Sequence, residues 1–497
     1  MAKRAPAILA AVLVLIATAR IVSTYTVLSH TMDEPEHLGC GMQWLARGQY
    51  TWDPSHPPIA RVLAIIGPYL DGARYLDAPG SHAEGILLLG HGGHYDRTLA
   101  LARMGILPLF WIASLGVFLW ARSAGGPTAA VIAVFLFTTI PPVLAHAGLV
   151  TTDMAATAFG IVTFYCSLWW AERPDRARTL VFGIALGLAA LAKFSLLAYL
   201  PAGWVLLLLW RRPSRKTLRS YLAPLALAAV VGCLVIWAAY RFSFDRIPAP
   251  DLFAGIRGLL HHNAIGHDSY VLGARHRTGV WYFFPVVLGV KTPLAMLILL
   301  AWSLVRSWRR SLPVDAALAC SLGILLVAMT GRINIGVRHV LPVYGGLAVI
   351  CAVAAADIMR TAPRLLTGGL LALFAWQAIS GSVAHPDYLA YTNEIAGDHP
   401  QKFVAESDLD WGQDMKLVAA FLERRGVTHV AFTPYCASYL DAGRDFPQVT
   451  PTDWYRPLPG WNIVSLSGLE VYDHPGWANR IPPHARIGRT HWAYFFP

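Results

Sequence analysis

Long apolar segments recur along this chain, and they constrain its fold more than any other feature. Eleven of them approach the roughly 20 apolar residues that a helix needs to cross a bilayer. The predicted spans are 6–28, 99–121, 126–144, 146–170, 179–193, 195–210, 221–241, 282–305, 313–330, 339–358 and 365–384. The chain is 56% hydrophobic and only 14% charged, whereas soluble domains carry about 25% charged residues. The sequence therefore predicts an all-α polytopic membrane protein.

Basic residues between the spans predict the orientation of the chain. The basic clusters are Lys3-Arg4, Arg122, 173–178, 211–219, 306–310 and 360–364, and with eleven spans all of them lie on one side. Because Lys and Arg concentrate in cytoplasmic loops, we expect a multi-pass protein of the inner (plasma) membrane with a cytoplasmic N-terminus. The loops 29–98, 242–281 and 331–338 and the tail after residue 384 would then be periplasmic or extracellular. If 179–193 and 195–210 formed one span, every later loop would lie on the opposite side of the membrane. The net charge of +11 follows from the cytoplasmic loops and needs no nucleic-acid partner.

Two local features leave alternatives. The first apolar run has features of a signal peptide, with Lys3-Arg4 as its basic start and Ala17-Thr18-Ala19 as a cleavage site. Of the six cysteines, only Cys40 and Cys436 fall outside the apolar runs, where they form either a bridge or two free thiols. No CxxC pair indicates a zinc site.

An acidic stretch, 33–37, follows the first span, where the chain should leave the membrane. Three carboxylates and a histidine occur there within five residues. Charges at such a position are costly unless they are used; the alternative is a solvated acidic loop. Residues 34–46 predict a short helix ended by Gly48, and 58–70 predict a second helix with one apolar stripe, both lying along the membrane interface. Residues 71–98, rich in Gly and His, have no helical period, which leaves a flexible loop, a mobile lid or a metal-binding tract.

The composition changes after residue 384, where apolar runs shorten and charge rises. We therefore divide the chain into a transmembrane domain, 1–384, and a small soluble extracytoplasmic α/β domain, 385–497. In the second part, residues 413–425 predict a helix closed by a glycine, and 428–433 and 463–466 predict strands.

Polar residues that apolar helices do not need for folding gather on the predicted outer side. They are Asp33, Glu34, Glu36, His37, His56, Arg61, Asp153, Lys193, Lys291, Arg338 and His339. Acids facing cations suit a phosphate carried on a lipid. Cations hold the phosphate and stabilise the charge that develops on it, and a carboxylate takes the proton of an incoming hydroxyl. Single members have structural alternatives, since Lys193 can snorkel to the surface and Asp153 can cap a helix.

An ordered set of short motifs runs through nearly the whole chain. It comprises Asp33-Glu34-Pro35 with His37; His56-Pro57-Pro58 with Arg61; Thr152-Asp153; Leu191 to Phe194; Gly279 to Pro285 with Lys291-Thr292-Pro293; Asn334 to His339 before Leu341-Pro342; and, in the tail, His385 to Tyr391 and Glu406 to Asp414. This set resembles the GT-C membrane glycosyltransferases. It is closest in pattern to the bacterial relatives of the protein O-mannosyltransferases and of the lipid A aminoarabinose transferase.

The resemblance implies an inverting hexosyl or pentosyl transferase that takes its sugar from a polyprenyl phosphate. Asp33 matches the catalytic base, which would deprotonate the acceptor hydroxyl. Asp153 matches the second acidic position, and Glu34 belongs to the same catalytic set. The candidates for binding the substrate, chosen by charge and predicted depth, are Lys193, Lys291 and Arg338 for the phosphate, with Arg61, His56 and His339 behind them.

The resemblance also implies partners. Some members use a divalent metal such as Mg, Mn or Zn, and Glu36 and His37 could bind one here, although the spacing shows no clear ligand set. The partners would be a polyprenyl-phosphate-linked sugar, the lipid bilayer and an acceptor that is a protein, a lipid or a glycan. The tail lacks the β-trefoil-like repeats of the yeast-type mannosyltransferases, which weakens the case for a protein acceptor. Residues 406–414 either bind the acceptor or form a turn before the helix.

Two other classes of protein compete with a transferase. A transporter or flippase for lipid-linked sugars would hold its substrate in mid-bilayer between inverted repeats. Here the polar residues gather at one surface, the outer loops are large and the chain has no matching halves. A membrane anchor that only displays the tail would not need Asp33, Asp153, Lys193 and Lys291 near the membrane.

Overall fold

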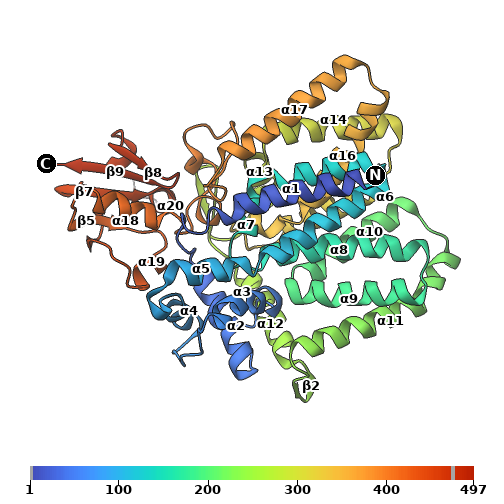
Figure 1. The fold of residues 1–497 in the computed structure, drawn as a ribbon, viewed down its shortest axis with the longest axis horizontal. Coiled ribbons are helices and arrows are strands. Elements are labelled where there is room, and N and C mark those ends of the chain that lie inside the picture. Colours follow the sequence, from blue (N-terminus) through green and yellow to red (C-terminus); the bar gives the residue numbers. More distant parts are fainter. Residues whose placement is uncertain (1–3, 472–475) are drawn as a thin grey trace.

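The computed structural model describes residues 4–471 and 476–497, in which a bundle of helices carries a smaller sheet at one end (Figure 1). The bundle helices are α1 (Ala5–Val22), α6 (Leu107–Thr138), α8 (Asp153–Glu172), α9 (Arg176–Ala192), α10 (Leu196–Arg211), α11 (Arg215–Ala239), α13 (Phe283–Lys291), α14 (Leu294–Arg310), α15 (Asp315–Thr330), α16 (Val343–Thr361) and α17 (Arg364–Val383). Within the described residues, six helices are long and apolar enough to cross a membrane, or up to seven if the bent pair α13–α14 is one span. The predicted polytopic helical fold is confirmed, and the number of eleven spans stays a prediction. Lys3 of the first basic cluster lies outside the described residues.

Helix α6 is a helical hairpin and not one straight rod. Gly126 has φ +84°, a conformation that L side chains rarely adopt. The Phe110 and Phe137 rings stack with 6.4 Å between their centroids, although in a straight helix these residues would be about 40 Å apart. The two legs are therefore antiparallel, and they correspond to the predicted spans 99–121 and 126–144.

Ion pairs at both ends show that α9 runs antiparallel to α8. Near the start of α9, Arg178 Nη1 lies 3.3 Å from Glu172 Oε2 at the end of α8. Directly after α9, Lys193 Nζ lies 2.5 Å from Oδ1 of Asp153, the first residue of α8. Helices α9 and α10 are therefore separate elements, as the division into 179–193 and 195–210 predicts.

The predicted span 282–305 is not one straight helix. Helices α13 and α14 are bent by 113° relative to each other, and Thr292 between them is extended, with φ −92° and ψ 133°. Pro293 explains the break, because a proline has no N–H to donate and pushes the residue before it out of the helical region. The bend leaves Lys291 at the end of α13, beside the tail.

The first outer loop contains more helix than its sequence predicts. Its helices are α2 (Glu34–Arg47), α3 (Pro58–Leu70), α4 (Ser81–Leu89), η1 (His91–Gly93) and α5 (Tyr95–Met104). The first two confirm the prediction, and Gly48 ends α2 at φ +69°. The others make the expectation of an irregular 71–98 wrong. Helix α4 packs so closely on α2 that a Cβ at Gly85 would lie 1.8 Å from the Pro35 carbonyl oxygen. This close backbone contact and the burial of Leu88 and Leu89 in the core hold α4.

The tail carries a five-stranded sheet of order β6-β5-β7-β9-β8, seen at the left of Figure 1. Strand β5 is parallel to β6 and β7, whereas β9 is antiparallel to β7 and β8. The tail elements are α18 (Met415–Glu423), β5 (His429–Thr433), α19 (Ser438–Asp441), β6 (Gln448–Thr450), β7 (Gly460–Ser465), α20 (Leu466–Val471), η5 (Trp477–Asn479), β8 (Ala485–Ile487) and β9 (His491–Phe496). The predicted helix and both predicted strands are confirmed.

Short elements complete the loops. They are α7 (Pro141–Ala147), β1 (Phe244–Asp245), β2 (Ile247–Pro248), α12 (Pro250–Ile265), β3 (Ser269–Val271), β4 (Ala274–His276), η2 (Val337–Val340), η3 (Pro400–Lys402) and η4 (Glu406–Asp408). Cys40 and Cys436 are both free and buried, so the structure has no bridge between them.

The buried carboxyl group of Asp414 lies between the start of α18 and the turn before β9. Asp414 Oδ2 accepts hydrogen bonds from the Thr490 hydroxyl at 2.7 Å and from the Arg489 N–H at 3.2 Å, and its Oδ1 has no hydrogen-bond partner among the described residues. Burial, and then the neighbouring carboxylates of Asp387 and Asp410, raise the pKa of Asp414 to about 7.

This raised pKa predicts that stability falls as the pH rises. An aspartate in an unfolded chain loses its proton near pH 4, so between about pH 4 and 7 the folded state binds more protons than the unfolded state. We expect the Tm in detergent to fall from about pH 5 to 8 and Asp414→Asn, which is neutral throughout, to flatten this dependence. Asp441→Asn, at the exposed end of α19, is the control. If the Tm of Asp414→Asn fell with pH as steeply as that of the wild type, the prediction would be wrong.

Candidate active site

Distant segments of the chain bring acids and cations together at the end of the bundle that faces the tail. Asp33 directly precedes α2, and its Oδ2 lies 2.9 Å from Nη1 of Arg338 in η2. The Arg338 guanidinium also lies over the Trp411 ring, 4.2 Å from its centroid. Arg338 is thus held between a carboxylate and an aromatic face, both of which favour its positive charge. The Asp33 side chain is still 34% exposed, so a substrate can reach it.

A second acid–cation pair joins the start of α8 to the end of α9. Asp153 begins α8, where the helix dipole favours a negative charge, and its Oδ1 is 2.5 Å from Lys193 Nζ. His146 Nδ1 lies 3.8 Å from the other carboxylate oxygen and has no hydrogen-bond partner among the described residues. Asp153 is 2% exposed and Lys193 12%, so the pair presents its cation, and not its acid, to a ligand.

Two histidines predicted to bind the substrate lie beside these pairs. Burial, and then the positive charges of Lys193 and Arg338, lower the pKa of His339 well below its usual value. His339 is therefore neutral at physiological pH. His56 contributes to the same electrostatic environment, and its Nδ1 lies 3.0 Å from Asp53 Oδ2.

Arg61 holds the first outer loop together instead of facing a ligand. Its Nε donates to His37 Nδ1 at 2.8 Å, and its Nη1 donates to the Tyr50 hydroxyl at 3.0 Å and to the Asp53 carbonyl at 2.7 Å. Its Nη2 pairs with the Asp53 carboxylate. Because Arg61 is fully buried and these N–H groups are occupied, the predicted role in substrate binding does not fit.

Lys291 binds carbonyl groups of the tail. Its Nζ donates to the carbonyl oxygens of Leu389 at 2.6 Å and Asp408 at 2.5 Å, and the side chain is buried. The predicted span 282–305 would place Lys291 inside one straight helix, but the bend at Pro293 leaves this residue at the end of α13, beside the tail. The structure therefore gives Lys291 an anchoring role.

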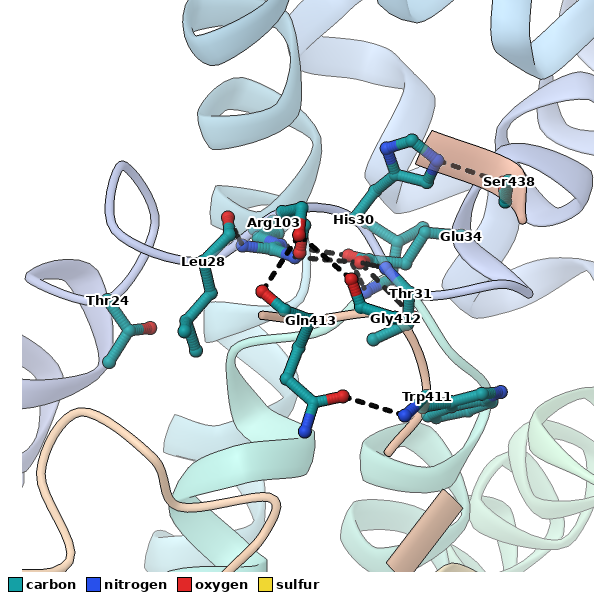
Figure 2. A network of polar contacts seen from close by, with 12 residues as sticks. Thr24, Leu28, His30, Thr31, Glu34, Arg103, Trp411, Gly412, Gln413 and Ser438 are labelled. Carbon is teal, nitrogen blue, oxygen red and sulfur yellow. Dashed lines mark hydrogen bonds and ion pairs between the residues drawn. The ribbon is translucent and has the colours of Figure 1, made fainter. Parts of the chain in front are cut away.

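Glu34 forms a buried ion pair with Arg103 at the centre of a polar network (Figure 2). Arg103 Nε and Nη2 donate to the two carboxylate oxygens at 2.9 and 2.8 Å. Glu34 also accepts from the N–H groups of Thr31 at 2.7 Å and Val150 at 3.0 Å. Burial alone would raise the pKa of Glu34, but Arg103 and these donors hold it below its usual value. With both oxygens occupied, Glu34 positions the loop, and the predicted catalytic role does not fit.

The same network ties the tail to the first outer loop. Arg103 Nη2 donates to the Ser29 carbonyl at 2.8 Å, and the Ser29 N–H donates to the Gln413 carbonyl at 2.9 Å. The Gln413 side chain in turn accepts from the Trp411 N–H at 2.8 Å, as Figure 2 shows. The ring that covers Arg338 is therefore held by the residues that surround Glu34.

The residues predicted to bind a metal do not form a metal site. Glu36 accepts from the Ser81 hydroxyl at 2.8 Å, and His37 Nδ1 accepts from Arg61. A guanidinium against the imidazole disfavours a second cation there. Across residues 4–471 and 476–497, no group of three or more His, Cys, Asp or Glu side chains is arranged to hold a metal ion.

Three residues of the site were not predicted individually. Arg103 lies in the predicted span 99–121, and an arginine within an apolar span is expected to have a partner or a function. Trp411 lies in a motif of the tail, but nothing local indicates that it covers Arg338. His146 is the first residue of the predicted span 146–170, but the structure places it in α7, and it reaches Asp153 only through the packing of α7 against α8.

The match to known families is partial in sequence and extensive in structure. A family model described as dolichyl-phosphate-mannose-protein mannosyltransferase matches residues 102–240. No curated protein sequence matches the chain. The fold and site described above define a polytopic membrane protein whose polar site lies at one end of a helical bundle.

Solved structures share this fold. The chain is similar to the crystal structure of ArnT from Cupriavidus metallidurans bound to undecaprenyl phosphate, with a TM-score of 0.56, 15% identity and 97% of both chains covered. It is similar to the apo state of that protein with a TM-score of 0.53, 16% identity and the same coverage. The archaeal oligosaccharyltransferase AglB from Archaeoglobus fulgidus matches with a TM-score of 0.47 and 15% identity, over 90% of this chain and 61% of that one. The ArnT-like fold over nearly the whole chain confirms the predicted GT-C fold.

Proposed function

We propose that this protein is an inverting glycosyltransferase that moves a hexose or pentose from a polyprenyl phosphate to an acceptor hydroxyl on the extracytoplasmic side of the membrane. The observation that carries the proposal is the convergence of Asp33–Arg338 and Asp153–Lys193 at one end of an ArnT-like bundle. The structure of ArnT with undecaprenyl phosphate supports the class of donor.

Asp33 is the general base in the proposed reaction. A carboxylate oxygen of Asp33 takes the proton of the acceptor hydroxyl while the hydroxyl oxygen attacks the anomeric carbon from the face opposite the phosphate. The bond between the anomeric carbon and the phosphate oxygen breaks, and its electron pair stays on the polyprenyl phosphate. Because attack and departure occur on opposite faces, the anomeric configuration inverts.

We assign Arg338 and Lys193 to the donor phosphate. The donor phosphodiester offers Arg338 two oxygens suited to bidentate hydrogen bonding, and its charge grows from one to two as the bond to the sugar breaks. The phosphate would therefore compete with Asp33 for Arg338 and free the base as the sugar is transferred. Asp153 keeps Lys193 at the site, and His339 and His56 offer hydrogen bonds at its edge.

We further propose that residues 1–384 are the catalytic membrane domain, with a cytoplasmic N-terminus in the inner membrane, and that 385–497 lie outside. Arg338 of the site contacts Trp411 of the tail, and the tail sheet lies at one end of the bundle (Figure 1). The acceptor would be a protein, a lipid or a glycan. A transporter or flippase is the second candidate, but the two acid–cation pairs lie at the bundle end beneath the tail and not midway along the helices.

The proposal is tested with purified full-length protein in detergent, labelled polyprenyl-phosphate hexose and pentose, and a membrane extract as acceptor pool. We expect the label to move to an acceptor, whose class identifies the substrate. Binding of the lipid with no turnover of any donor would favour the transporter.

Lys193→Met is expected to weaken the binding of undecaprenyl phosphate by about tenfold or more, because one charge-assisted contact is lost. Binding is measured by thermal shift and by retention of labelled lipid. Lys416→Met, which removes a cation that pairs with Asp96 outside the site, is the control. Since Lys193→Met leaves Asp153 buried without its partner, the double variant with Asp153→Asn is measured as well. Equal binding by Lys193→Met and Lys416→Met would overturn the assignment.

A further inference from the structure

The tail segment Ser407–Trp411 contacts the turn that carries Arg338. Both carboxylate oxygens of Asp408 accept from the Val337 N–H, at 2.9 and 3.2 Å. The Ser407 hydroxyl donates to the Ile335 carbonyl. Asp408 and Ser407 are both buried. The backbone on either side of Gly336 is therefore held by the tail, immediately before Arg338.

Gly336 is what allows the turn to approach so closely. Its φ is +145°, and a Cβ at this position would lie 2.5 Å from the Ser407 hydroxyl oxygen and 3.3 Å from Asp408 Oδ1. A side chain would push the tail away from the turn. The contact thus depends on complementary residues in two segments that are far apart in the sequence.

Lys291 anchors the other side of the tail segment to the bundle. Its Nζ binds the Asp408 carbonyl oxygen at 2.5 Å, while the carboxylate of the same residue binds the Val337 N–H. The chain of contacts runs from α13 through Lys291 and Asp408 to Val337. It fixes the backbone from which the Arg338 side chain extends.

Trp411 acts at the other end of the arginine. Its ring covers the guanidinium, and its own backbone is held on both sides. The Trp411 N–H donates to Gln413 Oε1 at 2.8 Å, and the Trp411 carbonyl accepts from the Met32 N–H at 3.1 Å. Met32 directly precedes Asp33, so the same tail residue borders both members of the Asp33–Arg338 pair.

We propose that Asp408 and Trp411 are positioning residues that set the place of Arg338, so that the tail is a working part of the site. Asp408 fixes the backbone of the arginine, and Trp411 fixes its guanidinium. This assigns residues 407–411 a role that is neither acceptor binding nor a simple turn. The inference deepens the proposed function and rests on it for the ligand, but the contacts themselves can be tested without turnover.

The backbone arm of the test is hydrogen–deuterium exchange on the full-length protein in detergent. Asp408→Ala should speed exchange in the peptide 332–341 by about tenfold or more, because the Val337 N–H loses its buried acceptor. Asp408→Asn keeps an acceptor oxygen and should exchange nearly as the wild type does. Unchanged exchange in Asp408→Ala would overturn the role of Asp408. Faster exchange spread over the whole bundle would overturn it equally, because it would reveal general unfolding.

The side-chain arm measures the binding of undecaprenyl phosphate. Trp411→Leu should weaken binding by about tenfold, as expected for loss of a desolvated cation–π contact. Trp411→Phe should retain most of the affinity, and Trp461→Leu in the distant strand β7 is the matched control. In an Arg338→Gln background, Trp411→Leu should cause no further loss; a full additional tenfold loss would show that Trp411 acts independently of Arg338. Wild-type protein that binds no lipid would refute the proposed function, while the exchange arm would still decide the role of Asp408.

Discussion

Asp33→Asn is expected to remove nearly all sugar transfer, with kcat lower by about 100- to 10,000-fold. An amide cannot take the acceptor proton, but it keeps the size of the carboxylate and an oxygen that accepts from Arg338. Because the Asp33 side chain is 34% exposed, losing its charge should cost little stability. The measurement is kcat and KM for transfer from the labelled donor, with thermal stability and undecaprenyl-phosphate binding followed in parallel.

Asp71→Asn is the matched control, since Asp71 is an acid of the same outer loop that pairs with Arg97 at the surface. It should transfer sugar at the wild-type rate. Sugar transfer by Asp33→Asn at the wild-type rate would exclude Asp33 as the base, although the protein would still be a glycosyltransferase. Loss of lipid binding with an unchanged rate at saturation would make Asp33 a binding residue instead.

The members of the two ion pairs could be predicted from the sequence one at a time. A charge beside an apolar span is costly without a use, and this principle singles out Asp33, Asp153, Lys193 and Arg338. Their pairing could not be predicted. Asp33 and Arg338 meet only because the start of α2 and η2 lie side by side, and hydrophobic periodicity carries no information about which helix ends are neighbours.

Charge and depth alone do not separate a group that binds a ligand from one that binds the protein. Arg61 and Lys291 have the charge expected of phosphate ligands, yet their N–H groups are occupied by Asp53 and by carbonyls of the tail. Glu34 differs from Asp33 by one position, but the start of α2 turns it inward to Arg103. Helix α4 escaped prediction because its buried face has helical spacing but is only partly apolar; it comprises Ser81, Glu84, Gly85, Leu88 and Leu89.

Glu34→Gln is expected to destabilise the folded protein by about 3–5 kcal/mol, the cost of breaking a buried ion pair and leaving one charge without its partner. The amide nitrogen of glutamine would face the donors of Arg103, Thr31 or Val150, all of which now point at carboxylate oxygens. We expect a much lower yield of monodisperse protein and a markedly lower Tm in detergent. Glu36→Gln, two residues on and hydrogen-bonded only to Ser81 in the described contacts, should stay close to the wild type.

The double variant Glu34→Gln/Arg103→Met separates loss of charge balance from loss of packing. Since most of the cost of Glu34→Gln comes from the unpaired guanidinium, removing Arg103 as well should recover a large part of the stability. The two changes would then be strongly non-additive in Tm. Additive losses would mean that the pair contributes through separate contacts, and a wild-type Tm for Glu34→Gln would contradict the structural role. Because this network also holds Gln413 and Trp411, any Glu34 variant that folds should bind undecaprenyl phosphate less tightly, through the displaced Trp411 and Arg338.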